Sequence, residues 1–140
     1  MNPIEAYGYN QVGCGWRFIL EALDSVLANA IMNARLNAVA LPQYRDEENT
    51  EQADITIDQV KEKFGGLRVY LDYIGISQTF HDEVNGAVMM AERLAAMHCE
   101  QCGSRENVEN RGVKDVKRSW TLTLCGACHK KRDDTKGETK

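Results

Sequence analysis

The sequence predicts an α+β protein with a four-cysteine module towards its C-terminal end. Three observations carry this prediction: two stretches whose apolar residues recur every three or four positions, one stretch in which they alternate around a Gly-Gly turn, and two Cys-x2-Cys pairs. The first spacing is typical of one face of a helix, and alternation is typical of a strand. We expect two amphipathic helices, one β-hairpin and a compact module around the cysteines.

The first amphipathic helix is predicted from Trp16 to Asn37. Its apolar stripe consists of Trp16, Ile19, Leu20, Leu23, Val26, Leu27, Ala30, Ile31 and Ala34. Gly13 and Gly15 precede the helix, and Pro42 prevents it from continuing because proline lacks an amide hydrogen.

An acidic segment, residues 45–58, separates this helix from the hairpin. It holds six carboxylates and is predicted to be a solvated connection that leads into a strand. A sharper alternative is an acidic surface for a basic partner, formed by Asp46, Glu47 and Glu48.

The hairpin is predicted over residues 55–74. Apolar and polar residues alternate on both sides of the Phe-Gly-Gly turn at residues 64–66, which is the pattern of half-buried strands. Gly65 and Gly66 can adopt the positive φ of a tight turn. The alternation changes phase between Ile57 and Val60, which predicts a β-bulge.

The second helix is predicted to begin at about Thr79, where acidic residues follow as helix-start signals. Its apolar stripe consists of Phe80, Val84, Ala87, Val88, Ala91, Leu94 and Ala95, and it leads directly to Cys99. The chain therefore divides into a helix–hairpin–helix region (1–98), a four-cysteine module (99–129) and a polar tail (130–140).

The four cysteines of the module are spaced as metal ligands. Cys99 and Cys102 form one Cys-x2-Cys pair, and Cys125 and Cys128 form the second after 22 intervening residues. Two such pairs provide the tetrahedral thiolate shell that zinc prefers, and four sulfur ligands leave no open position for a substrate. We expect one structural zinc ion, in a zinc ribbon or, if a helix follows the second pair, a treble clef.

Charge and composition narrow the class of protein. The net charge is −4, divided into −7 over residues 1–98 and +3 over residues 99–140. An acidic chain is disfavoured as a non-specific DNA-binding protein, which needs positive charge to neutralise phosphates. Neither a signal-peptide pattern nor an apolar run of roughly 20 residues is visible, so we expect a cytoplasmic protein without a membrane partner. Thiols stay reduced in the cytoplasm, which favours metal ligands over disulfides. Cys14, the unpaired fifth cysteine, is expected to be a small buried or half-buried hydrophobe.

Two basic sets are candidate interaction surfaces. Lys61, Lys63 and Arg68 surround the hairpin turn, close to Phe64 and Tyr70, and a solvated turn is the favoured interpretation of this set. The second set is denser and includes Lys114, Lys117 and Arg118, with Trp120 beside them. Cations interleaved with aromatic rings suit a nucleic-acid strand or an acidic protein surface.

A nuclease alternative arises from the second cysteine pair. The segment Leu124–Lys131 resembles the closing knuckle of zinc-containing HNH endonucleases. Members of that class carry a catalytic histidine between the knuckles, whereas residues 103–124 contain none. His129 alone does not make a catalytic set, so we expect a protein that is not an enzyme.

Taken together, several motifs resemble a known group of proteins. The helix opening GWRFILEAL from Gly15, the block VKEKFGGLRVY from Val60, and the CExCG and LCxxC knuckles are similar to small, largely uncharacterised zinc-finger proteins of bacteriophages and bacterial genomes. The resemblance covers most of residues 13–129. It implies a phage-encoded accessory protein in the host cytoplasm that binds a host protein machine, such as a nucleic-acid-targeting defence system, and inhibits or redirects it. A nucleic-acid-binding zinc finger is the alternative, and an HNH-like nuclease is third.

Overall fold

The computed structural model describes residues 1–40, 50–114 and 119–138. Over these ranges the chain forms, in order, α1 (Pro3–Tyr7), the short 3-10 helices η1 (Tyr9–Gln11) and η2 (Cys14–Trp16), α2 (Arg17–Ala40), β1 (Asp54–Lys63), β2 (Gly66–Ile74), α3 (Gln78–Ala96), β3 (Glu109–Lys114), β4 (Ser119–Leu124) and α4 (Gly126–Glu138). The predicted α+β class is confirmed. None of the described helices is both long and apolar enough to cross a lipid bilayer.

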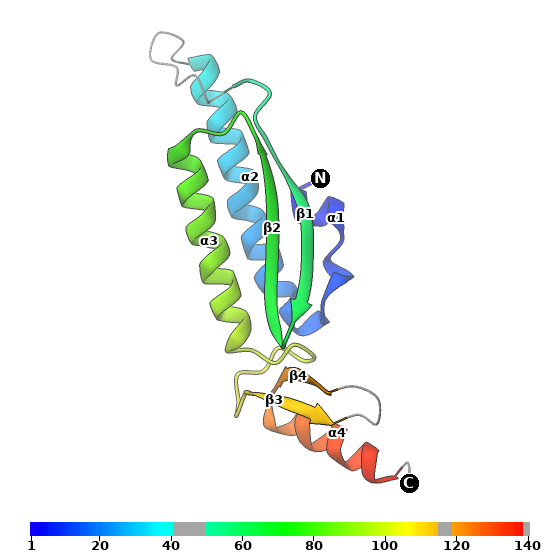
Figure 1. Ribbon diagram of the computed structural model, residues 1–140. Helices are drawn as coiled ribbons and strands as arrows, with labels where there is room; N and C mark the ends of the chain where they lie inside the picture. The colour runs from blue at the N-terminus through cyan, green and yellow to red at the C-terminus, as the bar shows by residue number, and fades with distance from the viewer. Residues whose placement is uncertain (41–49, 115–118, 139–140) are drawn as a thin grey trace.

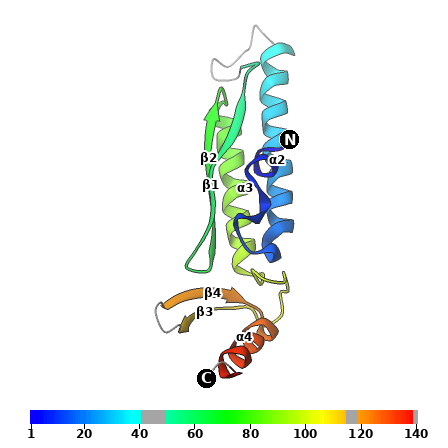
Figure 2. The same cartoon turned by 90° about the vertical axis from the view of Figure 1, so that its right-hand side faces the viewer.

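The larger part of the molecule has two layers. Helices α2 and α3 lie side by side against one face of the β1–β2 hairpin, as the two views in Figures 1 and 2 show. The predicted apolar stripes face the core between the layers, where Trp16, Leu20, Leu27, Leu67 and Val84 are buried. Leu94 was predicted in the second stripe but is 36% exposed. The C-terminal module lies at the end of these layers, below the hairpin turn in Figure 1.

The hairpin has the predicted bulge and a tight turn. The register of β1 against β2 shifts between Ile57 and Gln59, which confirms the bulge. Lys63 pairs with Gly66, so the two turn residues are Phe64 and Gly65, with φ of 54° and 77°. Both values belong to a type I′ turn, whose preferred sequence is Asn-Gly. Positive φ therefore falls on Phe64, which has a side chain, and not on Gly66.

The C-terminal module contains a second hairpin followed by a helix. Strands β3 and β4 pair antiparallel from Glu109↔Leu124 to Lys114↔Ser119. Helix α4 starts within the second cysteine pair, at Gly126. Because a helix follows the second knuckle, the module is a treble clef and not a ribbon. The helix continues to Glu138, through most of the segment that was expected to be a polar tail.

The N-terminal helix α1, which the sequence did not predict, is fixed to α2 by one buried carboxylate. Asp24 is fully buried and accepts hydrogen bonds from the backbone N–H groups of Ile4 and Glu5, at 2.7 and 2.9 Å. The hydroxyl of Tyr9 donates to the same carboxylate at 2.8 Å. Burial, together with this hydrogen bond, raises the pKa of Tyr9 to about 12.

Candidate metal centre

The four cysteines of the two pairs come together in one cluster. Their sulfur atoms all lie within 4.8 Å of one another, and the Sγ atoms of Cys102 and Cys125 are 3.6 Å apart. Zinc–sulfur bonds of 2.3 Å in a tetrahedron would place the sulfurs about 3.8 Å apart. The cluster therefore has the size of a four-thiolate metal shell.

The two knuckles that carry these sulfurs have the same local hydrogen bonds. The backbone N–H of Cys102 donates to Cys99 Sγ at 3.4 Å, and that of Cys128 donates to Cys125 Sγ at 3.5 Å. Burial raises the pKa of the Cys99 thiol, but hydrogen bonds from backbone N–H groups to its sulfur have the larger combined effect. The net result is a pKa of about 7 for Cys99, below the ordinary value of a thiol. Burial and the neighbouring sulfurs raise the pKa of Cys128. The cluster thus favours a first thiolate, and a bound cation would favour ionisation of the others.

The first knuckle is docked on the segment that precedes α2. The backbone N–H of Gly15 donates to the carbonyl oxygen of Glu100 at 3.0 Å, and the indole Nε1 of Trp16 donates to the carbonyl oxygen of His98 at 3.0 Å. A Cβ atom at Gly15 would lie 2.2 Å from the carbonyl oxygen of Cys99. Only glycine allows the knuckle to approach this closely.

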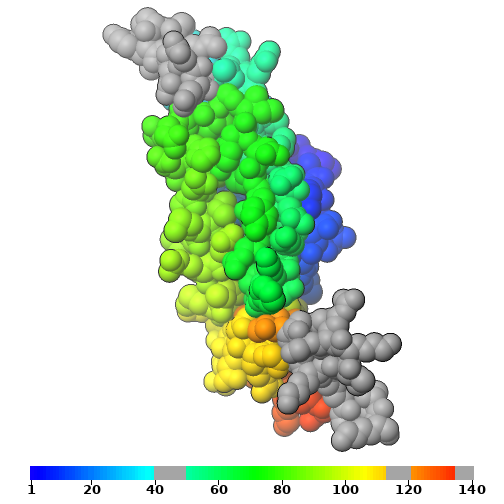
Figure 3. Space-filling view, in the orientation of Figure 1, coloured from blue at the N-terminus to red at the C-terminus, as the bar shows by residue number. Residues whose placement is uncertain are grey.

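The treble clef is also docked on the turn of the β1–β2 hairpin. The buried hydroxyl of Thr123 donates to the carbonyl oxygen of Gly65 at 2.6 Å. Asn110 Nδ2 donates to the carbonyl oxygen of Phe64 at 3.0 Å and to Thr123 Oγ1 at 2.8 Å. Figure 3 shows the surface of the hairpin continuing into that of the module. The cysteine cluster therefore belongs to a junction of three segments: residues 13–16, the hairpin turn and the treble clef.

The histidines near the cluster are engaged in structural hydrogen bonds. Nε2–H of His129 donates to the carbonyl oxygen of Glu109 at 2.8 Å, and Nδ1 accepts from Arg111 Nε at 3.1 Å. Nδ1–H of His98 donates to the carbonyl oxygen of Leu94 at 2.6 Å, and its ring packs edge-on against Phe18. Both ring nitrogens of His129 are thus occupied, and the residue is buried.

The candidate surface residues are divided between two hairpins. Lys61 and Lys63 lie on β1, and Arg68 lies on β2 opposite Lys61. Lys114 is the last residue of β3, and Trp120 lies on β4, where it pairs with Val113. Asp46, Glu47, Glu48, Lys117 and Arg118 lie outside the described residues.

Aromatic rings and cations meet near the turn of the first hairpin. Lys61 Nζ is 5.6 Å from the ring centroid of Tyr70, and Lys63 Nζ is 5.8 Å from that of Phe64. Phe64 is 71% exposed, the highest value for an aromatic side chain in the described parts of the chain. We call Lys61, Lys63, Phe64, Arg68 and Tyr70 the tip surface.

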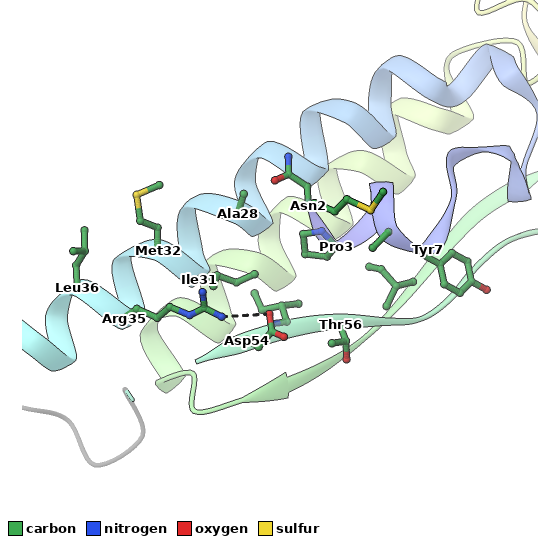
Figure 4. A pocket seen from close by; sticks show the side chains of 14 residues that line it. Asn2, Pro3, Tyr7, Ala28, Ile31, Met32, Arg35, Leu36, Asp54 and Thr56 are labelled. Carbon is green, nitrogen blue, oxygen red and sulfur yellow. Dashed lines mark hydrogen bonds and ion pairs between the residues drawn. The ribbon is translucent and has the colours of Figure 1, made fainter. Parts of the chain in front are cut away.

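A groove of about 740 Å³ lies elsewhere, between α1, α2 and β1 (Figure 4). Its walls include Ile31, Met32 and Leu36. Within it Arg35 donates from Nε to the carbonyl oxygen of Ala53 at 2.7 Å and forms an ion pair with Asp54 at 3.9 Å. The groove contains none of the candidate residues predicted from the sequence, and its charged groups contact each other.

The chain matches no protein-family model, no curated protein and no solved structure. Sequence reasoning identified the cysteines but not the docking residues Gly65, Asn110 and Thr123. The sequence feature that could have indicated this contact is the Phe-Gly-Gly turn. Without a Cβ atom, Gly65 allows Asn110 and Thr123 to approach the turn closely.

Proposed function

We propose that Cys99, Cys102, Cys125 and Cys128 bind one zinc ion with a structural role. The observation that supports zinc is a set of four sulfurs within 4.8 Å of one another, which would leave a tetrahedral ion no free coordination position. The ion would hold the two knuckles together and thereby hold the docking surfaces of Glu100 and Thr123 in place.

Zinc analysis of two cysteine variants tests this assignment. We expect one zinc ion per chain, lost or greatly reduced in Cys125→Ser. Cys14→Ser is the matched control, because Cys14 is an exposed thiol outside the cluster, and not the buried or half-buried residue expected from the sequence. This variant should keep its zinc. A Cys125→Ser protein with full zinc content and an unchanged melting temperature would contradict the proposal.

We further propose that the protein is not an enzyme and acts by binding a protein partner through the tip surface. The observation that carries this proposal is Phe64, a highly exposed aromatic residue held at a φ of 54°. Positive φ is unfavourable for a bulky side chain, and such local strain often marks a functional position. An exposed aromatic side chain surrounded by cations has the composition of an interface anchor.

The partner would have an apolar pocket for Phe64 with acidic groups around it. Lys61, Lys63 and Arg68 would complement that acidic rim and accelerate association. A phage-encoded accessory protein that inhibits or redirects a host machine is the specific role that we infer from the sequence resemblance. Nucleic acid is the second candidate partner, since a strand could stack on Phe64 and Tyr70 beside the lysines.

Affinity capture with the zinc-loaded protein, with and without nuclease treatment, separates these partners. A protein retained in stoichiometric amount after nuclease treatment would support the first candidate. Capture of nucleic acid alone, or of proteins that nuclease releases, would support the second. Metal-dependent cleavage of DNA that is lost in His129→Ala would overturn the non-enzymatic assignment.

Phe64→Asn tests the tip surface directly. Asn-Gly is the preferred type I′ sequence, so this variant should melt at a higher temperature, while binding of the captured partner weakens at least tenfold. Ile74→Asn is the control, because Ile74 is 57% exposed at the other end of the same hairpin. Equal binding by wild type and Phe64→Asn in a titration would refute the role of the tip surface.

A further inference from the structure

The outward face of α3 is apolar along its middle. Met89 and Met90, in the middle of the helix, are 56% and 62% exposed, and Met97, directly after its last residue, is 49% exposed. Figures 1 and 2 show α3 along one flank of the molecule, with α2 and the hairpin on its inner side. Methionine side chains grouped on one helix face form an adaptable apolar contact surface.

A glycine lies on the same face, one turn before Met90. Gly86 is exposed, and a Cβ atom at this position would meet nothing within 4 Å. No contact within the described chain requires glycine here, although glycine destabilises the interior of a helix relative to alanine. A missing side chain does, however, leave a hollow into which a side chain of a second helix can insert.

The charges on this face have opposite signs at its two ends. Asp82 and Glu83 lie in the second turn of α3, and Arg93 lies in its last turn. Asp82 and Arg93 are separated by about 16 Å along the helix, which is too far for an ion pair within one copy. Two antiparallel copies of α3 would place Arg93 of each copy opposite the acidic end of the other.

The same antiparallel register also matches the apolar groups. With the two-fold axis at the level of Val88, Met90 of one copy faces Gly86 of the other, and the reverse contact forms by symmetry. The same register places Arg93 of one copy opposite Glu83 of the other. A face that is complementary to itself in both shape and charge is the requirement for a two-fold interface. We propose that this protein forms a homodimer through antiparallel packing of α3.

The dimer should be reversible and dependent on concentration. A single pair of helices buries less surface than the roughly 800 Å² per partner of a standard interface. The zinc-loaded protein is therefore studied by sedimentation velocity over a wide range of concentrations. Sedimentation as a monomer at every concentration would overturn the proposal.

Met90→Glu tests the apolar contact. This variant should remain monomeric at concentrations where the wild type is a dimer, because it places two carboxylates against the facing helix. Met32→Glu is the matched control, since Met32 is 52% exposed on α2, and it should dimerise as the wild type does. A Met90→Glu protein that dimerises with wild-type affinity would refute the interface.

A charge exchange tests the antiparallel register. Arg93→Glu alone and the double variant Asp82→Lys/Glu83→Lys alone should each lose dimerisation through repulsion of like charges. An equimolar mixture of the two proteins should recover it as a heterodimer, because each variant supplies the charges that the other needs. Failure of the mixture to associate would overturn this register.

Gly86→Leu distinguishes an effect on dimerisation from an effect on the stability of the fold. The substitution should raise the melting temperature of the monomer, because leucine is a better helix former and meets open space. It should also abolish the dimer by filling the hollow that receives Met90. A Gly86→Leu protein that dimerises as tightly as the wild type would contradict the close approach of the helices.

Discussion

Single residues at the junction matter because backbone atoms meet there without side chains between them. Gly15 lies against the carbonyl oxygen of Cys99 and the amide nitrogen of Gly103, which a Cβ atom would approach to 2.2 and 2.6 Å. Both neighbours are backbone atoms of the first knuckle, so neither can move aside as a flexible side chain would. A methyl group at this position must therefore displace the knuckle.

Gly15→Ala is predicted to destabilise the protein by about 1–3 kcal/mol, the range for overpacking of a well-packed site. Urea unfolding of the zinc-loaded protein measures this change. Gly112→Ala is the control, because Gly112 has nothing within 4 Å of the added methyl group, and its effect should be within about 0.5 kcal/mol. Equal stability of Gly15→Ala and wild type would show that the knuckle is not docked on Gly15.

At the scale of elements, the β1–β2 hairpin has two roles. Its middle forms one layer of the core through Val60, Leu67 and Val69. Its turn reaches beyond the helices and contacts β3 and β4 through the hydrogen bonds of Asn110 and Thr123. The conformation of the turn and the position of the treble clef are thus determined together.

Thr123→Val is predicted to weaken this docking. The substitution removes the hydroxyl that donates to Gly65 and accepts from Asn110, and leaves a buried carbonyl oxygen without its donor, at a cost of about 2 kcal/mol. Thermal unfolding should show the loss. Thr121→Val, on the same strand, is the control and should change stability by less than half as much. The hypothesis fails if both variants unfold alike.

The long elements could be predicted from the sequence, and the short ones could not. Helices α2 and α3 and the first hairpin have regular apolar patterns over many residues, which local periodicity reveals. Helix α1 has only five residues and is held by Asp24, which is 20 residues away from Ile4. Helix α4 lacks an apolar stripe and is fixed by the second cysteine pair and the ion pair between Arg111 and Asp133 at 2.8 Å. Helices α1 and α4 are stabilised by tertiary contacts, which cannot be predicted from a local sequence pattern.

At the scale of the whole molecule, the treble clef is joined to the helix–hairpin–helix region by two separate contacts. One involves Gly15 and Trp16, and the other involves the turn at Gly65. The ligand residues could be predicted because Cys-x2-Cys spacing is local. The docking could not, since the residues that meet are far apart in the sequence.

Zinc removal is predicted to loosen both docking contacts and not only the treble clef. Structural zinc contributes on the order of 10 kcal/mol to small metal-organised folds. Hydrogen–deuterium exchange with and without a chelator should therefore show faster exchange at residues 13–18 and 62–68, as well as in residues 99–138. Protection in the middle of α2, around Leu27, should change least. Faster exchange confined to residues 99–138 would show that the two regions are energetically independent.

The separation of the docking partners along the chain also has a consequence for the order of folding. The hydrogen bond from Trp16 to His98 spans 82 residues, and that from Thr123 to Gly65 spans 58. Contacts between such distant segments form slowly, because a long loop must close before the contact contributes energy. During synthesis, the start of α2 and the hairpin turn leave the ribosome well before Cys128. If the module binds zinc as we propose, these early segments can dock only after the metal-bound module has formed. We therefore expect the supply of zinc to limit how quickly a newly made chain matures.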